Sequence, residues 1–174
     1  MPTAVIGIGS NVGNKIQICR RAIDLLQEMP SHQVVKLSSW YDTVPIGYKN
    51  QPNFINAVLI LQTIVPPFKL LEILQNLECK LGRKATWRNG PRPIDLDLIL
   101  YDNLVIDRDD LTVPHPRFAE RAFVLIPLVE IWPDLIHPVY FRSMSGLLDD
   151  LGSVRHLIKK HHHPDQKSAP PHMS

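Results

Sequence analysis

Several features that mark membrane, secreted and nucleic-acid-binding proteins are scarce or missing in this sequence. Only two of its 174 residues are cysteines, Cys19 and Cys79, and both lie in apolar, helix-like segments. We therefore expect two buried thiols and no disulfide framework. No apolar run approaches the ~18 residues that a membrane span needs. The first basic residue is Lys15, so no charged start precedes an apolar signal core, and we expect a cytoplasmic protein.

The sequence also lacks a large excess of one charge. It has 19 basic and 17 acidic residues, and the stretch 153–174 alone contributes four of the basic residues against one acidic residue. Without that stretch, the chain is close to neutral. Proteins that bind duplex nucleic acids do so largely through basic surfaces that contact the phosphates. The charge balance therefore argues against that class.

The residues that are present fit a globular protein. Apolar residues make up 44% of the chain, and 16 prolines predict many rigid loops. A chain of this length is typical of one domain, which we place at residues 1–158. Residues 159–174 are rich in histidine and have no apolar periodicity. We expect this tail to be disordered.

The pattern of apolar residues predicts an alternation of strands and helices. In order, we expect a strand at 4–9, a helix at 15–29, strands at 34–41 and 54–63, a helix at 66–81 and a strand at 94–101. This β-α-β-β-α-β order is typical of a ferredoxin-like α+β sandwich, with an antiparallel sheet and helices packed on one face. C-terminal additions follow, with helices at 119–131 and 145–151 and a short strand at Tyr140 and Phe141.

The segment 94–100 carries the clearest chemical signal. Alternate residues of a strand face opposite sides, so Leu96, Leu98 and Leu100 are expected to enter a core, and Asp95 and Asp97 to share the other face. Their Cβ atoms would then lie roughly 6.6 Å apart, at about 3.3 Å per residue. Such a pair can hold magnesium, which prefers oxygen ligands and often binds one or two carboxylates together with phosphates. The alternative is a solvent-facing strand with two ordinary aspartates.

Basic residues lie just before this strand. Arg83, Lys84, Arg88 and Arg92 fall within ten residues of one another, and Trp87 lies among them. Cations beside a carboxylate pair would suit a polyphosphate bound together with a metal. Otherwise these residues form a solvated basic loop.

A third group of polar residues follows a Pro-rich turn. His115 lies between Pro114 and Pro116, and Arg117 and Arg121 follow it. The prolines stiffen the backbone, which predicts a fixed imidazole that faces phosphate. The alternative is a histidine in a rigid turn.

The glycines at 7–13 do not form a known nucleotide-binding pattern. They follow a strand and precede a helix, but the third glycine comes one residue too late for a dinucleotide-binding turn. A P-loop pattern is also missing, so a nucleotide would have to bind by another route.

Five stretches of the sequence together resemble the family of 6-hydroxymethyl-7,8-dihydropterin pyrophosphokinases, enzymes of folate biosynthesis. They are GIGSN at 7–11, SSWYDTVPIG at 38–47, QPNFINAV at 51–58, GPRPIDLDLILY at 90–101 and LTVPHPRFAERAFVLIPLVEI at 111–131. The resemblance implies a ferredoxin-like fold and transfer of the diphosphate of ATP to the hydroxymethyl group of a reduced pterin, with AMP as the other product. It also implies a monomer that binds only small molecules.

The resemblance also implies roles for individual residues. Asp95 and Asp97 would bind two Mg²⁺ ions and, with Arg83 and Arg92, form the catalytic group. ATP would be bound by Glu78, Arg83, Arg88, Arg92, Ile99, Thr112, His115 and Arg121, with Lys84 or Arg88 as the mobile cation of the basic loop. The pterin would lie between Phe54 and Phe123, near Asp95, with its edge facing Thr43, Val44, Ile46 and Asn56.

The sequence departs from the family pattern in two places. Phe54 stands where tyrosine is frequent, which keeps a ring but removes a hydroxyl. The basic loop is one residue shorter, with Trp-Arg-Asn at 87–89.

Two functions from other classes also deserve comparison. A metal-dependent glycosyltransferase would use Asp95 and Asp97, but it would need a larger α/β domain. An RNA-binding ferredoxin-like module would need sheet-face aromatic residues in the RNP pattern and a basic fold, and both are missing.

Overall fold

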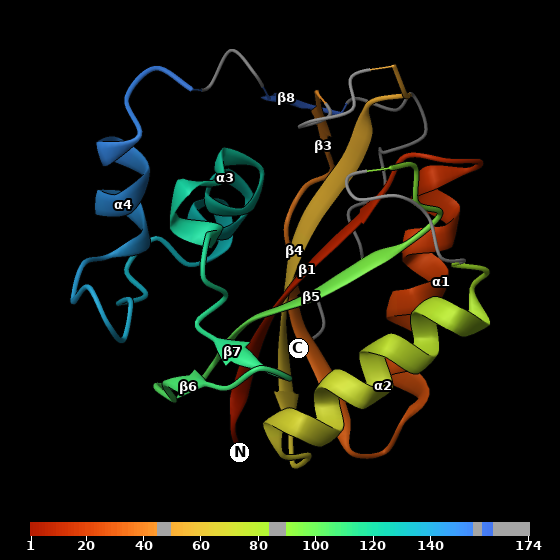
Figure 1. Ribbon diagram of the computed structural model, residues 1–174, viewed down its shortest axis with the longest axis horizontal. Coiled ribbons are helices and arrows are strands. Elements are labelled where there is room, and N and C mark those ends of the chain that lie inside the picture. Colours follow the sequence, from red (N-terminus) through yellow and green to blue (C-terminus); the bar gives the residue numbers. More distant parts are fainter. Residues whose placement is uncertain (45–49, 84–89, 155–157, 162–174) are drawn as a thin grey trace.

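The computed structural model describes residues 1–44, 50–83, 90–154 and 158–161 (Figure 1). Its main sheet is antiparallel. Strand β1 (Thr3–Ser10) lies between β4 (Phe54–Thr63) and β5 (Asp95–Tyr101). Strands β2 (His32–Leu37) and β3 (Tyr41–Thr43) pair with opposite ends of β4. This arrangement confirms the predicted ferredoxin-like topology.

The strand expected at 34–41 is two strands in the structure. The amide N–H of Ser38 donates to the carbonyl of Val58, and the N–H of Val58 donates to the hydroxyl of Ser38, both at 2.9 Å. A side chain thus takes a place that a backbone carbonyl would hold in a regular ladder. The edge of the sheet is interrupted there and resumes at β3, next to the candidate site.

Two helices cover one face of the sheet. Helix α1 (Lys15–Glu28) begins where the side chain of Asn14 accepts from the amide of Gln17, at 3.4 Å. Helix α2 (Pro67–Lys80) begins at a proline and is followed by Gly82, whose φ is +95°. Their apolar faces, including Cys19, Leu70 and Leu74, form one core with the sheet.

The C-terminal additions cover the other face. Helix α3 (Ala122–Ile131) packs there, and helix α4 (Met144–Asp150) packs on the outer side of α3, as Figure 1 shows; both contribute to a second core. Helix α3 is preceded by a single 3₁₀ turn, η1 (Phe118–Glu120), so the helix expected from 119 consists of two pieces. The short strand expected at Tyr140 and Phe141 is wrong, because both residues lie in a turn in which Phe141 has φ +56°.

Strand β5 changes face along its length. Leu96 and Leu98 enter the first core as predicted, but Leu100 lies in the second core with Ile99. The cause is a register shift of β5 against β1 between Val5 and Ile6, which reverses the alternation beyond Ile99. Asp95 and Asp97 precede the shift, so they still share one face.

The remaining described strands are short. A small hairpin joins β6 (Ile106–Asp107) and β7 (Thr112–Val113). Strand β8 (Ile158–Lys160) pairs with β3, and the amide of His161 donates to the carbonyl of Trp40. The domain boundary expected between residues 158 and 159 therefore falls within a strand. The rest of the expected tail, residues 162–174, lies outside the described residues.

Two expectations drawn from composition have different outcomes. Cys19 is buried, but Cys79 is exposed, so only one of the two thiols is buried. Cys79 lies off the stripe of α2 that faces the core, which contains Leu70, Leu74 and Leu77. Among the described residues, no helix has the length and apolar character of a membrane span.

Candidate active site

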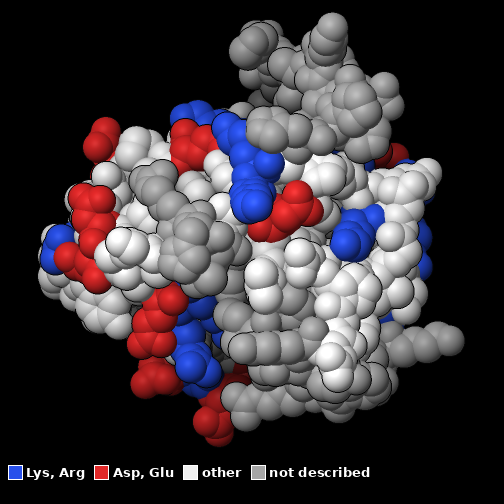
Figure 2. All heavy atoms as spheres, turned by 90° about the horizontal axis from the view of Figure 1, so that it is seen from above, with Lys and Arg blue, Asp and Glu red and all other residues white. Residues whose placement is uncertain are grey.

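The two aspartates of β5 lie in a cleft of about 420 Å³. It opens on the same face of the sheet that α3 covers, at the N-terminal end of that helix, where Phe123 lines it. Its lining residues are Thr43, Val44, Phe54, Asn56, Arg92, Asp95, Asp97, His115, Arg117, Glu120, Arg121 and Phe123. Figure 2 looks onto the upper end of the molecule, where basic and acidic side chains lie next to each other near the centre.

The two carboxylates of this pair repel each other. Burial, together with the negative charge of Asp95, raises the pKa of Asp97 to about 7, against the opposing effect of Arg121. Two such oxygen donors on one strand face fit a divalent cation, because the cation would remove the repulsion between them. Among the described residues, no three His, Cys, Asp or Glu side chains form a ready-made metal site.

Asp95 is already paired with two arginines. Arg83 Nη1 lies 2.9 Å from Asp95 Oδ1, and Arg92 Nη1 lies 3.4 Å from Oδ2. Arg83 also forms an ion pair with Glu78, whose Oε2 accepts from the amide of Leu96 at 3.0 Å. Burial raises the pKa of Glu78, and the hydrogen bond from Leu96 and the charge of Arg83 oppose that increase.

His115 is held in a defined orientation. Its amide donates to the carbonyl of Ile99 at 2.8 Å, and its Nδ1 accepts from the amide of Arg117 at 3.4 Å. Burial, together with the positive charge of Arg121, lowers the pKa of His115 to about 4. A neutral ring that accepts at Nδ1 carries its proton on Nε2, so it can donate one hydrogen bond.

Part of the cleft lining is aromatic and amide-bearing. Phe54 and Phe123 both line the cleft, and Arg121 lies over the ring of Phe123, 5.6 Å from its centre. Asn56 Nδ2 donates to Thr43 Oγ1 at 2.6 Å. Gly9 makes room for this amide, because a Cβ at position 9 would lie 2.5 Å from Asn56 Oδ1. The wall therefore suits a flat ring with a polar edge.

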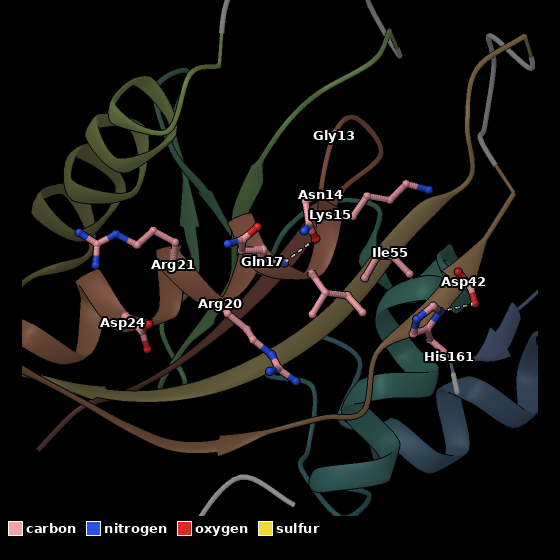
Figure 3. Close-up of a pocket in the computed structure, with 11 residues that line it drawn as sticks. Gly13, Asn14, Lys15, Gln17, Arg20, Arg21, Asp24, Asp42, Ile55 and His161 are labelled. Carbon is pink, nitrogen blue, oxygen red and sulfur yellow. Dashed lines mark hydrogen bonds and ion pairs between the residues drawn. The ribbon is translucent and has the colours of Figure 1, made fainter. Parts of the chain in front are cut away.

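A second, larger groove of about 710 Å³ lies on the opposite face of β4 (Figure 3). Ile55 lines it, whereas its neighbours Phe54 and Asn56 line the cleft. Its acidic side chains, Asp24 of α1 and Asp42 of β3, come from separate elements, and Asp42 is bonded to His161 at 2.9 Å. It has no carboxylate pair of the kind found in the cleft, which therefore remains the better candidate.

A comparison with protein families decides the identity. The family model described as 7,8-dihydro-6-hydroxymethylpterin-pyrophosphokinase (HPPK) matches residues 5–133. The chain belongs to the HPPK family. The resemblance noted in the sequence is thereby confirmed, and the glycosyltransferase and RNA-binding alternatives are set aside.

Bacterial HPPK proteins are similar over most of their length. The chain is 44% identical over 128 residues to the 2-amino-4-hydroxy-6-hydroxymethyldihydropteridine pyrophosphokinase of Bacillus subtilis, which covers 74% of this chain and 77% of that protein. For the Aquifex aeolicus protein of the same name, identity is 41% over 145 residues, and the shares are 83% and 89%. The chain spans only 20% of the "Folic acid synthesis protein fol1" of Schizosaccharomyces pombe, at 39% identity.

A solved structure has the same fold. The crystal structure of wild-type Plasmodium falciparum HPPK-DHPS with pterin and p-hydroxybenzoate superposes with a TM-score of 0.73 at 14% sequence identity. The match covers 91% of this chain and 45% of that chain. At such low identity the likeness concerns the fold alone.

Most residues expected from the HPPK resemblance come together in the structure. Ten of them line the cleft: Thr43, Val44, Phe54, Asn56, Arg92, Asp95, Asp97, His115, Arg121 and Phe123. Arg83 and Glu78 lie directly behind Asp95. Ile99 and Thr112 do not line the cleft, since Ile99 is buried in the second core and Thr112 lies in β7. The expected residues Ile46, Lys84, Trp87 and Arg88 lie outside the described residues.

Sequence reasoning missed two features of the site. Glu120 also lines the cleft, beside Arg117, which the sequence had already grouped with His115. Asn11 is fully buried, and its Oδ1 accepts from the amide of Arg92 at 2.7 Å. Its Nδ2 donates to Gln51 Oε1 at 2.7 Å, so one amide joins the segments on both sides of the cleft. Only the GSN motif could have drawn attention to Asn11.

Proposed function

We propose that this chain transfers the diphosphate of ATP to the hydroxymethyl group of 6-hydroxymethyl-7,8-dihydropterin, a step of folate synthesis. The observation that carries the proposal is one cleft that is lined by a carboxylate pair, by cations and by two aromatic rings. The hydroxymethyl oxygen would attack the β-phosphorus and form a new O–P bond. The bond from that phosphorus to the oxygen shared with the α-phosphorus would break, AMP would leave with the electron pair, and the hydroxyl proton would pass to water.

Asp95 and Asp97 would hold two Mg²⁺ ions. Their shared face and the raised pKa of Asp97 support this assignment. When bound, magnesium would screen the triphosphate so that the hydroxyl can approach the β-phosphorus. The cations Arg83, Arg92 and Arg121 would bind phosphate oxygens, and Nε2 of neutral His115 would donate to one of them.

The pterin would lie between Phe54 and Phe123. Stacking on two rings favours a flat heteroaromatic molecule, and the Thr43–Asn56 pair would contact its polar edge. In this position the hydroxymethyl group would point toward Asp95, because the rings and the aspartates line the same cleft. Val44 lines the cleft on the same side as Thr43.

The chain would act as a monomer in the cytoplasm. One chain supplies the cations, carboxylates and rings of the cleft, so the chemistry needs no partner subunit. Both cysteines are free thiols, which suits a reducing compartment.

Product analysis with and without metal tests this function. The purified chain is incubated with ATP, Mg²⁺ and the hydroxymethyl dihydropterin, and the pterin is examined by mass spectrometry. We expect a pterin that carries a diphosphate, formed only with Mg²⁺, and a loss of nearly all turnover in Asp97→Asn. ATP consumption that does not depend on the pterin, or that persists with excess chelator, would contradict the proposal.

A further inference from the structure

Glu130 links the last turn of α3 to the segment that carries strand β3. Its Oε1 accepts from the amide of Ser39 at 2.7 Å, and its Oε2 accepts from the hydroxyl of Tyr41. Nζ of Lys160, in β8, lies 3.8 Å from the same Oε2. Burial acts to raise the pKa of Glu130, but the hydrogen bonds from Tyr41 and Ser39 lower it overall. The group is therefore a carboxylate, and both of its oxygens hold the β3 edge of the sheet.

Tyr41 connects this carboxylate to the part of the cleft proposed for the pterin. Strand β3 has only three residues, and in its register with β4 Tyr41 lies opposite Asn56. Tyr41 and Thr43 share a face, because side chains alternate along a strand. On that face the Tyr41 ring packs in the second core, and Thr43 lines the cleft. A shift of Tyr41 would therefore move Thr43 and its hydrogen bond with Asn56.

Helix α3 also carries one side of the proposed pterin site. Phe123 lies in its first turn and lines the cleft, and Glu130 follows seven residues later. Because a helix has about 3.6 residues per turn, the two side chains lie on one side of α3, roughly 10 Å apart along its axis. We call the space between Phe54 and Phe123 the pterin slot. Helix α3 thus connects one ring of the slot to the residue that holds β3.

The rest of the fold holds α3 more firmly than β3. Helix α3 has Val124, Leu125 and Leu128 buried in the second core. Strand β3 is separated from β2 by the break at Ser38, and it pairs only with one end of β4 and with the three residues of β8. A loss of the Glu130 contacts would therefore displace β3 and leave α3 in place. The two aspartates would also stay, because β1 and β4 separate β5 from β3.

We infer that Glu130 is a positioning residue that holds β3, through Tyr41, at the distance from Phe123 that admits the pterin ring. Glu130 sets the width of the pterin slot on its Thr43 side and takes no part in the phosphate chemistry. The inference rests on the proposed function and deepens it, because it assigns pterin binding in part to the far end of α3. A carboxylate suits this task, since its two oxygens accept from an amide and a hydroxyl at once.

Steady-state kinetics with each substrate varied in turn test this role. Glu130→Ala removes both acceptors, and we expect it to raise KM for the pterin roughly 10-fold, with KM for ATP and kcat changed by less than about twofold. Tyr41→Phe removes one hydroxyl and keeps the buried ring, so it should raise KM for the pterin roughly fivefold. In the Tyr41→Phe background, Glu130→Ala should add only about twofold, because most of its effect passes through Tyr41.

Direct binding and a matched control complete the design. Titration of the pterin onto protein saturated with Mg²⁺ and a non-hydrolysable ATP analogue should show the same losses in affinity. Asp150→Ala removes a carboxylate of another helix, α4, that pairs with Arg142 at 2.7 Å, and it should change neither KM by more than about twofold. Thermal unfolding is measured for every variant. If Glu130→Ala does not fold, Glu130→Gln, which keeps one acceptor, takes its place in the cycle.

Failure of this inference can be told from failure of the proposed function. If KM for ATP rises by the same factor as KM for the pterin, or if neither rises, Glu130 does not position the pterin slot and the inference is wrong. Additive effects of the two substitutions would exclude an action through Tyr41 and would overturn it as well. Each of these results leaves the proposed function intact as long as the unmodified chain makes the pterin diphosphate. If the unmodified chain makes none, the proposed function itself is overturned.

Discussion

Arg92 forms an ion pair with Asp95, three residues further along the chain, with 3.4 Å between Nη1 and Oδ2. Arg83 occupies the other oxygen of the same carboxylate. In the absence of substrates, the arginines therefore take the place that a metal would need. We expect metal to bind weakly without nucleotide and more tightly once phosphates draw the arginines away.

Removing Arg92 should expose this competition. An ion pair near the surface is worth about 0.2–1 kcal/mol, so Arg92→Met should tighten Mn²⁺ binding without nucleotide by up to roughly fivefold. Arg117→Met is the matched control, because it removes the same charge from the same cleft, and Arg117 forms its ion pair with Glu120 instead of Asp95. Equal tightening in both variants would show a general effect of charge and would refute a direct competition for Asp95.

The raised pKa of Asp97 predicts how stability depends on pH in the metal-free chain. Its pKa of about 7 lies above the ordinary value of 3.8, so between those values the native state binds the proton more strongly than the unfolded state. Stability from this group is therefore lost as pH rises through that window. Asp97→Asn should unfold at a higher temperature than the unmodified chain at pH 8, and the difference should shrink at pH 5.

Asp95→Asn provides the contrast for this measurement. It leaves Arg83 and Arg92 without their shared partner, so its melting temperature should not rise at pH 8. If both variants gain the same stability, simple removal of negative charge explains the effect, and the buried position of Asp97 does not.

His115 should have the opposite dependence on pH. Its pKa of about 4 lies below the ordinary value of 6.5, so within that window the unfolded state binds the proton more strongly. The native state loses stability as pH falls from about 6.5 toward 4. We expect the melting temperature of His115→Gln to fall less than that of the unmodified chain between pH 7 and pH 5. Parallel curves for the two proteins would show that His115 is not held neutral.

Two glycines of β1 offer a matched pair for testing whether Asn56 binds the pterin. A Cβ on Gly9 would lie 2.5 Å from Asn56 Oδ1, whereas a Cβ on Gly7 would meet Ile99 at an ordinary 3.5 Å. Gly9→Ala should therefore displace the Asn56 amide and weaken pterin binding roughly 10-fold, the equivalent of about 1.4 kcal/mol. Gly7→Ala should have little effect. Titration of each variant with the pterin would contradict this role of Asn56 if both bind equally well.

The parts of the site that were predictable from sequence depend on local spacing. Asp95 and Asp97 share a face because the period of a strand is two residues, and His115 is stiffened by its own neighbours. The turn of Leu100 into the second core was not predictable, because the register shift depends on pairing with β1. The break after Leu37 likewise needs the contact between Ser38 and Val58, which lie 20 residues apart.

The partners of the charged residues were the least predictable feature. The basic loop was recognised from its composition, but that Arg83 binds Glu78 and Asp95 follows only when α2 packs beside β5. The role of Asn11 could not be predicted for the same reason, since its partners, Gln51 and Arg92, lie 40 and 81 residues away in sequence. Such contacts depend on the tertiary fold.

The most direct test of the central claim is the identity of the adenine nucleotide product. Reactions with ATP, Mg²⁺ and the hydroxymethyl dihydropterin are stopped at intervals, and AMP, ADP and the pterin product are quantified by chromatography. Attack at the β-phosphorus predicts one AMP for each pterin diphosphate formed, with no ADP from the reaction. ADP as the main product, together with a pterin monophosphate, would mean attack at the γ-phosphorus and would contradict the account.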